Sequence, residues 1–239
     1  MTNMFDSNYY DRKYFADKDG KKFHRPGGIT DRWGYRNPEG EWTGCKPIVE
    51  AWKSIFNPRD MLDVGCGRGT FVTYSRDVGI KAEGFDFSEW VANNPYRRCK
   101  KEWIRVHDAV KPWPYPDKNF DLVTILDLME HIYVDNIDFV INETYRVAKK
   151  WIFFQIATVK QGSHEKGYII KKGDSIPIDL EVYAVAGHVL VQTEKFWIDK
   201  LKRDGWKIRK DLVDQFCKIV PDDVIRNWTL NTLIIMERE

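Results

Sequence analysis

The stretch that decides the fold runs from Met61 to Phe71 and reads MLDVGCGRGTF. A short apolar segment that carries one acid, Asp63, is followed by glycines at positions 65, 67 and 69. Glycine adopts positive φ angles and lets the backbone approach a ligand closely. The free N–H groups at the start of a following helix can face the same ligand. The stretch therefore predicts a buried strand, a ligand-binding turn and a helix, in that order.

This turn differs from two common nucleotide-binding turns. A dinucleotide fingerprint, G-x-G-x-x-G, would need a glycine at position 70, which is Thr70. A P-loop would end in Gly-Lys-Ser/Thr, and the stretch has no such ending. A carboxylate beside the turn, here Asp63, would repel a phosphate and attract an ammonium group. We expect a ligand with a cationic amine and no pyrophosphate, and a dehydrogenase with a variant glycine turn stays open as an alternative.

The composition is that of a globular protein with a substantial core. The chain has 239 residues, 43% of them hydrophobic and 31% charged, with a formal net charge of +2. This balance gives no argument for a nucleic-acid partner or an anionic membrane. No run approaches the roughly 18 apolar residues of a membrane span. The cysteines, at 45, 66, 99 and 217, never form C-x-x-C, so we expect free thiols in a reducing cytosol.

From about residue 45 onward, strand-like and helix-like segments alternate, which predicts a parallel sheet with helices on both faces. The expected helices cover 47–56, 70–78, a segment from Glu89 capped by Ser88, 135–149 and 193–203. The expected strands cover 61–64, 80–87, 103–107, 120–127, 151–157, 206–212 and 229–238.

Two segments do not follow this alternation. Residues 1–44 are polar, aromatic and glycine-rich, and residues 158–192 form a long irregular connection. Long connections in a compact domain are usually functional or disordered, and the aromatic content argues against disorder. We expect an N-terminal cap or lid over 1–44 and a substrate-binding insertion at about 158–192 within a domain that spans 45–239.

Further acids follow the expected strands. Asp86 ends the second strand about 20 residues after the glycines, where a carboxylate can accept two hydrogen bonds from a ribose diol. Asp108 follows the third strand and can accept from the exocyclic amine of a purine, with Phe87 and Ala109 covering the ring faces. Asp127 ends the fourth strand. Open α/β sheets bind ligands at these strand ends. A ligand with a ribose, a purine and a cationic amine fits S-adenosylmethionine.

Four stretches in order resemble the class I S-adenosylmethionine-dependent methyltransferases. They are LDVGCGRGTF at 62–71, EGFDFSE at 83–89, VHDA at 106–109 and WPYPDKNFDLVTILDLMEHI at 113–132. The resemblance runs from about residue 47 to residue 237. The fourth stretch is similar to the small-molecule branch, near the ubiquinone, menaquinone and glycan-modifying enzymes. The resemblance implies a methyltransferase with a Rossmann-like sheet of seven strands, mostly parallel with an antiparallel last strand. The cysteine usage leads us to expect a cytoplasmic protein.

The resemblance also implies which residues bind S-adenosylmethionine. It places the turn around the methionine and ribose portion, Asp86 at the ribose hydroxyls and Asp108 at the adenine amine. Asp63 would lie near the methionine amine, with Asp127 and Leu128 beside it. The turn and the adenine-covering positions complete the set: Gly65, Cys66, Gly67, Gly69, Phe87 and Ala109.

Methyl transfer is an in-line displacement, for which an enzyme supplies mostly proximity and alignment. A hydroxyl acceptor also needs a base, and histidine is the natural candidate. His131 follows the fourth strand and His188 belongs to the 158–192 segment, so these two are the candidate bases. A structural role stays open for each of them. We expect His24, His107 and His164 to be structural or exposed, and we expect no metal site.

The acceptor is the least defined part of the hypothesis. The stretch YYDRKYF at 9–15 resembles the opening of glycan-associated methyltransferases and can fold over the cofactor. Trp33, Tyr35 and Trp42 either form walls of an acceptor pocket or anchor the cap by packing. The stretch NNPY at 93–96 looks like the signature of nucleic-acid amino-methyltransferases, but it lies between the second and third strands instead of after the fourth.

We therefore expect a small-molecule or glycan-like acceptor and no nucleic acid or membrane partner. O-methylation is slightly favoured over N-methylation because histidines are available as bases. Besides the dehydrogenase, two alternatives stay open: a protein-modifying methyltransferase, and a non-catalytic S-adenosylmethionine-binding partner protein. The sequence leaves the oligomeric state open.

Overall fold

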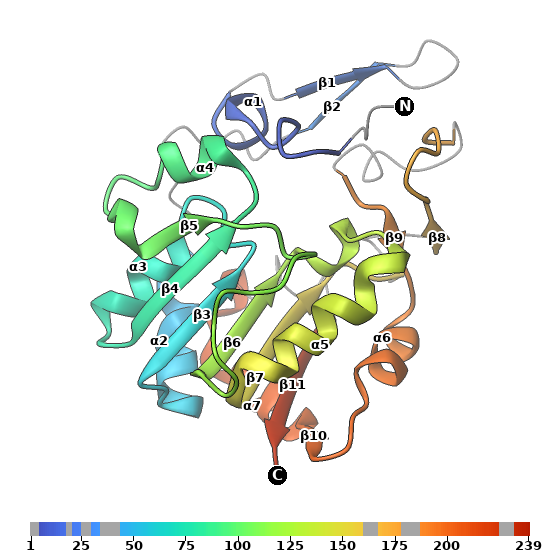
Figure 1. The fold of residues 1–239 in the computed structure, drawn as a ribbon. Helices are drawn as coiled ribbons and strands as arrows, with labels where there is room; N and C mark the ends of the chain where they lie inside the picture. The colour runs from blue at the N-terminus through green and yellow to red at the C-terminus, as the bar shows by residue number, and fades with distance from the viewer. Residues whose placement is uncertain are drawn as a thin grey trace.

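A computed structural model describes residues 5–17, 44–159, 167–177, 187–224 and 232–239, together with the backbone of 21–24 and 30–33 (Figure 1). No helix within these ranges is long and apolar enough to cross a membrane. All four cysteines lie in these ranges, and none of them forms a disulfide.

The central sheet has seven strands in the order β10-β11-β7-β6-β3-β4-β5. Strands β3 to β7 pair in parallel, whereas β11 runs antiparallel to both β7 and β10. The expected mostly parallel sheet with an antiparallel last strand is confirmed. The strand bounds are β3 (Asp60–Val64), β4 (Lys81–Asp86), β5 (Ile104–Val106), β6 (Phe120–Leu126), β7 (Ala148–Ile156), β10 (Trp206–Ile208) and β11 (Thr232–Arg238).

Helices cover both faces of this sheet (Figure 1). Leu62 and Val64 of β3 belong to the core beneath α5 (Ile137–Val147) and α6 (Glu194–Leu201). Met61 of the same strand faces the opposite core, which contains α2 (Cys45–Phe56), α3 (Thr70–Asp77) and α7 (Lys210–Ile219). Neighbouring residues of a strand point to opposite faces, so one apolar run serves both cores.

Shorter elements surround the sheet. Ser88 caps α4 (Glu89–Asn93) as expected, because its Oγ accepts from the N–H of Val91 at 3.3 Å. The other elements are α1 (Arg12–Phe15), β1 (Lys21–His24), β2 (Thr30–Trp33), the 3₁₀ helices η1 (Lys101–Trp103), η2 (Met129–His131) and η3 (Val134–Asn136), β8 (Tyr168–Ile169) and β9 (Leu190–Val191).

Two of the expected elements were wrong in their extent. The strand expected over 206–212 ends at Ile208, and the chain turns into α7, which the sequence analysis missed. Phe216 of α7 is fully buried and its ring lies 5.0 Å from that of Phe153. The helix expected over 135–149 ends at Val147, because Ala148 already pairs with Phe120 as the first residue of β7.

The N-terminal segment, residues 5–17, lies across the carboxyl ends of the parallel strands (Figure 1). Its aromatic side chains Phe5, Tyr9, Tyr10 and Tyr14 are buried and form one apolar cluster with Ile170, Ile176 and Val189. The segment thus forms a roof together with residues from 167–177 and 187–191. The domain limits expected from the sequence, 1–44 and about 158–192, stay predictions.

Candidate active site

The glycine turn between β3 and α3 has the backbone that the sequence implied. Gly65, Gly67 and Gly69 all have positive φ angles, of 72°, 49° and 77°. The N–H groups of Gly65 and Cys66 donate to the carbonyl of Phe85 at 2.9 and 3.0 Å, which ties the turn to β4. A Cβ atom at position 69 would lie 2.5 Å from the Cys99 sulfur. Backbone conformation and close packing therefore both require glycine here.

The carboxyl group of Asp86 holds this turn from the end of β4. Its Oδ2 accepts from the N–H of Gly67 at 3.1 Å, and its Oδ1 accepts from the N–H of Ser88 at 2.9 Å. Burial raises the pKa of Asp86, and the backbone N–H donors act in the opposite direction by stabilising the charged form. A carboxylate oxygen accepts more than one hydrogen bond, so both oxygens retain capacity for a diol.

Asp63 lies at the end of β3, inside the cavity wall. Only 2% of the residue is exposed, and its Oδ1 accepts from the hydroxyl of Thr124 at 2.8 Å. Burial raises the pKa of Asp63 to about 7, although the hydrogen bond from Thr124 acts to lower it. A cation bound nearby would lower this pKa and favour the carboxylate form of Asp63.

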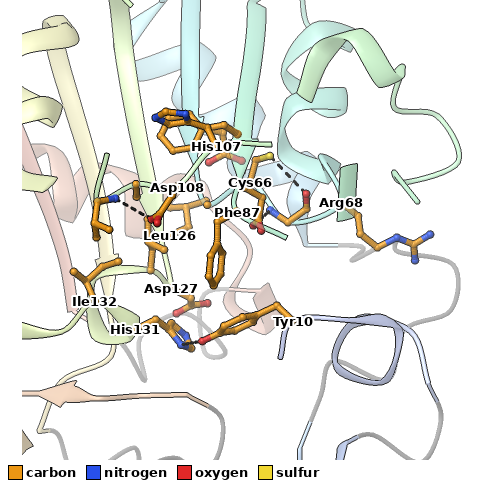
Figure 2. A pocket seen from close by; sticks show the side chains of 18 of the residues that line it. Tyr10, Cys66, Arg68, Phe87, His107, Asp108, Leu126, Asp127, His131 and Ile132 are labelled. Atoms are coloured by element: carbon orange, nitrogen blue, oxygen red, sulfur yellow. Dashed lines mark hydrogen bonds between the residues drawn. The ribbon is translucent and has the colours of Figure 1, made fainter. Parts of the chain in front are cut away.

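These groups line one cavity of about 580 Å³ at the carboxyl ends of β3, β4 and β6 (Figure 2). Nearly all of the sequence-predicted site residues take part in its wall: Asp63, Gly65, Cys66, Gly67, Asp86, Phe87, Asp108, Ala109, Asp127, Leu128 and His131.

Two predicted residues are not in the wall itself. Gly69 is buried behind the turn, against Cys99 and Ile104, so it shapes the turn instead of facing the cavity. His188 packs edge-to-face against His131, with ring centroids 4.7 Å apart.

The end of the cavity beyond β4 suits a flat ring. Phe87 and Ala109 line it, as does Asp108, whose Oδ1 accepts from the N–H of Val110 at 3.1 Å. His107, expected to be structural or exposed, also lines this end. An apolar surface and a carboxylate acceptor thus lie at the same end of the cavity, and the purine contact stays a prediction.

His131 lies in the cavity wall next to Tyr10 of the N-terminal segment (Figure 2). Its Nδ1 is 3.1 Å from the hydroxyl oxygen of Tyr10 and 3.1 Å from the carbonyl oxygen of Gly187. Burial lowers the pKa of His131 to about 4, so the imidazole is neutral at pH 7. A neutral imidazole has one nitrogen with a free lone pair and can accept a proton.

A second pair of carboxyl groups lies next to this histidine. Burial raises the pKa of Asp127 and of Glu130 above their ordinary values, and the proximity of Asp127 raises that of Glu130 further. Oε1 of Glu130 accepts from the N–H of Ala157 at 3.1 Å, whereas the buried Oε2 has no hydrogen-bond partner among the described residues. Asp127 itself has a positive φ of 48°, and its N–H donates to the carbonyl of Gln155 at 3.0 Å.

Glu130, His131 and His188 are also the set to consider for a metal ion. One ligand atom from each lies within 4.8 Å of the others. Burial and the proximity of Asp127 raise the pKa of Glu130, which opposes the charged form that a cation would need. The expectation of no metal site stays a prediction.

Several wall residues were missed by the sequence analysis. The aromatic stretch at 9–15 indicated a segment that covers the site, but it did not indicate which aromatic side chains would line the cavity. Tyr35, Trp42 and His164, and the side chains of His24 and Trp33, lie outside the described residues. The wall residues without a predicted role include Phe5, Tyr10, Tyr14, Phe15, Arg68, Ile132, Tyr133, Asn136, Gln155 and Lys172.

The stretch that builds this cavity also matches a known family. Residues 62–152 match the family model described as "Methyltransferase domain". The chain therefore carries a methyltransferase domain over these residues. The match covers the glycine turn, Asp86, Asp108 and the segment around His131, and it ends within β7.

Two curated relatives align with this methyltransferase domain. A "Probable S-adenosylmethionine-dependent methyltransferase" of Mycolicibacterium smegmatis is 31% identical over 100 residues, which is 42% of this chain and 38% of the relative. Norajmaline N-methyltransferase of Rauvolfia serpentina is 33% identical over 82 residues, which is 31% of this chain and 28% of the relative. The aligned region thus spans well under half of either relative.

Solved structures share the fold of the domain. An S-adenosylmethionine-dependent methyltransferase from Mesorhizobium loti superposes with a TM-score of 0.54 at 17% identity, covering 80% of this chain and 95% of that one. The plantazolicin methyltransferase BpumL, solved in complex with a triazolic desmethylPZN analog and S-adenosylhomocysteine, superposes with a TM-score of 0.56 at 15% identity, covering 82% of this chain and 86% of that one. At these identities the likeness concerns the fold alone.

Proposed function

We propose that the protein transfers a methyl group from S-adenosylmethionine to a hydroxyl group of a small-molecule or glycan-like acceptor. One observation carries the proposal. The glycine turn and the acids at the ends of β3, β4 and β6 line the same cavity as a half-buried, neutral imidazole. A cofactor-binding end and a proton-accepting group therefore share one cavity.

The chemistry of the wall fits the donor. Asp86 offers oxygen lone pairs to a ribose diol while it holds the N–H of Gly67. Asp63 offers a buried carboxyl group, and an ammonium group placed beside it would favour the ionised form. Phe87 and Asp108 offer a ring face and an acceptor for adenine. The bare backbone of Gly65 leaves room, since a Cβ atom there would lie 3.1 Å from the side chain of Leu128.

The bound donor supplies an electrophilic methyl group on a sulfonium, and the protein supplies alignment and a proton acceptor. His131 is neutral at pH 7 and can take the proton of an acceptor hydroxyl as its oxygen attacks. Tyr10, Tyr14 and Phe15 cover the cavity from above and exclude water from the reacting groups.

A small acceptor is favoured over a protein segment. Two hydrogen-bonding contacts of Tyr10 hold the N-terminal segment over the cavity. Its carbonyl accepts a hydrogen bond from the hydroxyl of Ser88, and its own hydroxyl oxygen lies 3.1 Å from Nδ1 of His131. A protein substrate would need a broad open cleft instead. The relative from Rauvolfia serpentina bears the name of an N-methyltransferase, so an amine acceptor is the second candidate. A cytoplasmic location and the absence of a nucleic-acid partner stay predictions.

Calorimetric titration with S-adenosylmethionine and S-adenosylhomocysteine tests the donor. We expect micromolar binding to the wild-type protein. Asp86→Ala should weaken it at least tenfold, about 1.4 kcal/mol, because the ribose contact is lost and the Gly67 N–H loses its acceptor. Asp138→Ala is the matched control, since Asp138 lies on the outer face of α5 in an ion pair with Lys200.

Two outcomes would count against the proposal. Folded wild-type protein that binds neither compound would exclude the methyltransferase function. Tight binding without turnover, across a panel of phenols, sugars and amines, would favour the non-catalytic alternative.

A further inference from the structure

One ring nitrogen of His131 is held by two separate segments of the chain. The hydroxyl oxygen of Tyr10, from the N-terminal segment, lies 3.1 Å from Nδ1. The carbonyl oxygen of Gly187, from the segment before β9, lies 3.1 Å from the same atom. Residues 121 and 56 positions away in sequence thus meet at a single atom of the candidate base. Figure 2 shows Tyr10 and His131 pointing toward one another.

The approach of Gly187 depends on its being glycine. Its φ is +96°, and a Cβ atom there would lie 2.5 Å from the Tyr10 hydroxyl and 3.1 Å from Nδ1 of His131. The N–H of Val189 donates to the carbonyl of Glu130 at 2.8 Å, which fixes this segment beside η2. The backbone conformation of Gly187 and the hydrogen bond between Val189 and Glu130 therefore both hold the Gly187 carbonyl beside His131.

Tyr10 is also fixed to the cofactor side of the cavity. Its carbonyl accepts a short hydrogen bond from the hydroxyl of Ser88. The N–H of Ser88 in turn donates to Asp86, the predicted ribose ligand. The Tyr10 ring lies 5.2 Å from that of Phe87, centroid to centroid. One residue thus connects the loop after β4 with the histidine after β6.

The partners of Nδ1 determine where the imidazole carries its proton. A carbonyl oxygen only accepts hydrogen bonds, so the contact with Gly187 requires a proton on Nδ1. A hydroxyl oxygen accepts as readily as it donates, and Tyr10 can share the same N–H. In a neutral imidazole the lone pair is then on Nε2. The same logic orients histidines whose second nitrogen acts as a base.

We propose that Tyr10 is a positioning residue: together with the carbonyl of Gly187 it holds His131 in the Nδ1–H tautomer, so that Nε2 is the proton acceptor. This inference rests on the proposed function. The acceptor oxygen forms a bond to the methyl carbon, the sulfur takes the electron pair of the broken S–C bond, and the hydroxyl proton passes to Nε2. The N-terminal segment therefore completes the catalytic site as well as covering it.

Nitrogen NMR of histidine-labelled protein saturated with S-adenosylhomocysteine tests the tautomer without an acceptor. The His131 signal is identified by its loss in His131→Asn. Among the described residues, the titratable groups around the ring are Tyr10, His188, Glu130 and Asp127, so spectra are recorded at several pH values. We expect the Nδ1–H tautomer in the wild type at pH 7, and a mixture of tautomers with a mobile ring in Tyr10→Phe.

Tyr9→Phe is the matched control. Tyr9 belongs to the same buried aromatic cluster as Tyr10, but it is not in the cavity wall. We expect its spectrum to match the wild type. Gly187→Ala provides a second variant, and it should disturb the tautomer because its Cβ would collide with the Tyr10 hydroxyl. With an acceptor in hand, Tyr10→Phe should lower kcat about ten- to hundredfold and leave the donor Kd within about twofold.

Three results would overturn the inference. They are an Nε2–H tautomer in the wild type, a Tyr10→Phe spectrum identical to the wild type, and a shift of the His131 and His188 signals by one equivalent of added zinc or magnesium. The last would assign the cluster to a cation instead. A fixed Nδ1–H tautomer in protein that fails to bind S-adenosylhomocysteine would refute the proposed function and leave the positioning by Tyr10 intact.

Discussion

At the scale of single residues, Asp63 shows how burial prepares a group for its ligand. A carboxyl group with 2% exposure and a pKa of about 7 is protonated in much of the unliganded protein below neutral pH. An ammonium group placed beside it favours the carboxylate form and lowers this pKa. Binding of the donor should therefore release a proton from Asp63.

This coupling makes donor affinity depend on pH. Below about pH 7 we expect the affinity to fall toward tenfold per pH unit, because the carboxyl group must lose its proton first. Above about pH 8 the amine of the donor loses its charge, so the affinity should be highest between these limits. Titrations at pH 6 in two buffers of different ionisation enthalpy measure the proton released.

Asp63→Asn separates this effect from other titrations, since an amide keeps the shape and does not ionise. The variant should bind more weakly at pH 7.5 and lose most of the pH dependence on the acid side. Unchanged proton release in Asp63→Asn would assign the proton to another group and remove Asp63 from the ammonium contact.

Single residues also mark the limit of what the sequence could predict. Asp63, Asp86, Asp108 and Asp127 were predictable because the carboxyl ends of parallel strands converge on one edge of the sheet. The contact between Tyr10 and His131 was not, since it joins residues 121 positions apart through a roof with no periodic pattern. Nothing local in the sequence encodes such a pairing.

At the scale of elements, the glycine turn combines two separate reasons for glycine. Gly69 has a φ of 77°, and a Cβ there would lie 2.5 Å from the Cys99 sulfur and 3.0 Å from Ile104. Gly79 has a similar φ of 82°, but nothing lies within 4 Å of a Cβ atom there. The two positions therefore separate backbone strain from overpacking within one domain.

We expect Gly79→Ala to lower the free energy of unfolding by about 1–2 kcal/mol, from the left-handed backbone alone. Gly69→Ala should cost about 1–3 kcal/mol more, because the core around Cys99 must also shift. Urea denaturation of both variants measures the difference. Equal decreases in the free energy of unfolding would show that the side chains around Cys99 rearrange at no cost. Only the φ angle would then require glycine at position 69.

Elements were predictable where the hydrophobic period was unambiguous. The strands that pair in parallel were expected within a few residues, since each is a short apolar run bounded by turn residues. Helix α7 was missed because Trp206 to Leu212 reads as alternating residues, and the helical spacing of Val213 and Phe216 becomes meaningful only against Phe153. Tertiary packing decided between the two readings.

At the scale of the whole molecule, the site costs stability in the unliganded state. Burial raises the pKa of Asp63, Asp127 and Glu130, so the folded protein binds protons at these groups more tightly than the unfolded chain does. Stability from such groups is fully present below their unfolded pKa near 4 and is lost as the pH rises through the folded pKa. His131 acts in the opposite sense, since its folded pKa is lowered to about 4.

Three carboxyl groups outweigh one histidine between pH 5 and 7. The free energy of unfolding should therefore fall with rising pH in this range, by about 2–3 kcal/mol per pH unit, because the folded protein binds a net excess of about two protons. Ion pairs that lower the pKa of Asp121, Asp199 and Asp211 to about 2 act only at lower pH and leave this window untouched. Urea denaturation at half-unit steps of pH measures the slope.

Saturation with S-adenosylhomocysteine should flatten the slope, because its ammonium group lets Asp63 ionise within the folded protein. Asp63→Asn should flatten the unliganded slope by the share of one group, with Asp138→Asn, on the exposed face of α5, as the control. A stability that rises steadily from pH 5 to 7 would mean that these carboxyl groups are ionised in the empty cavity. A cation or an ordered network of hydrogen-bond donors would then have to stabilise the charged carboxyl groups. The electrostatic basis proposed here for the binding of S-adenosylmethionine would be wrong.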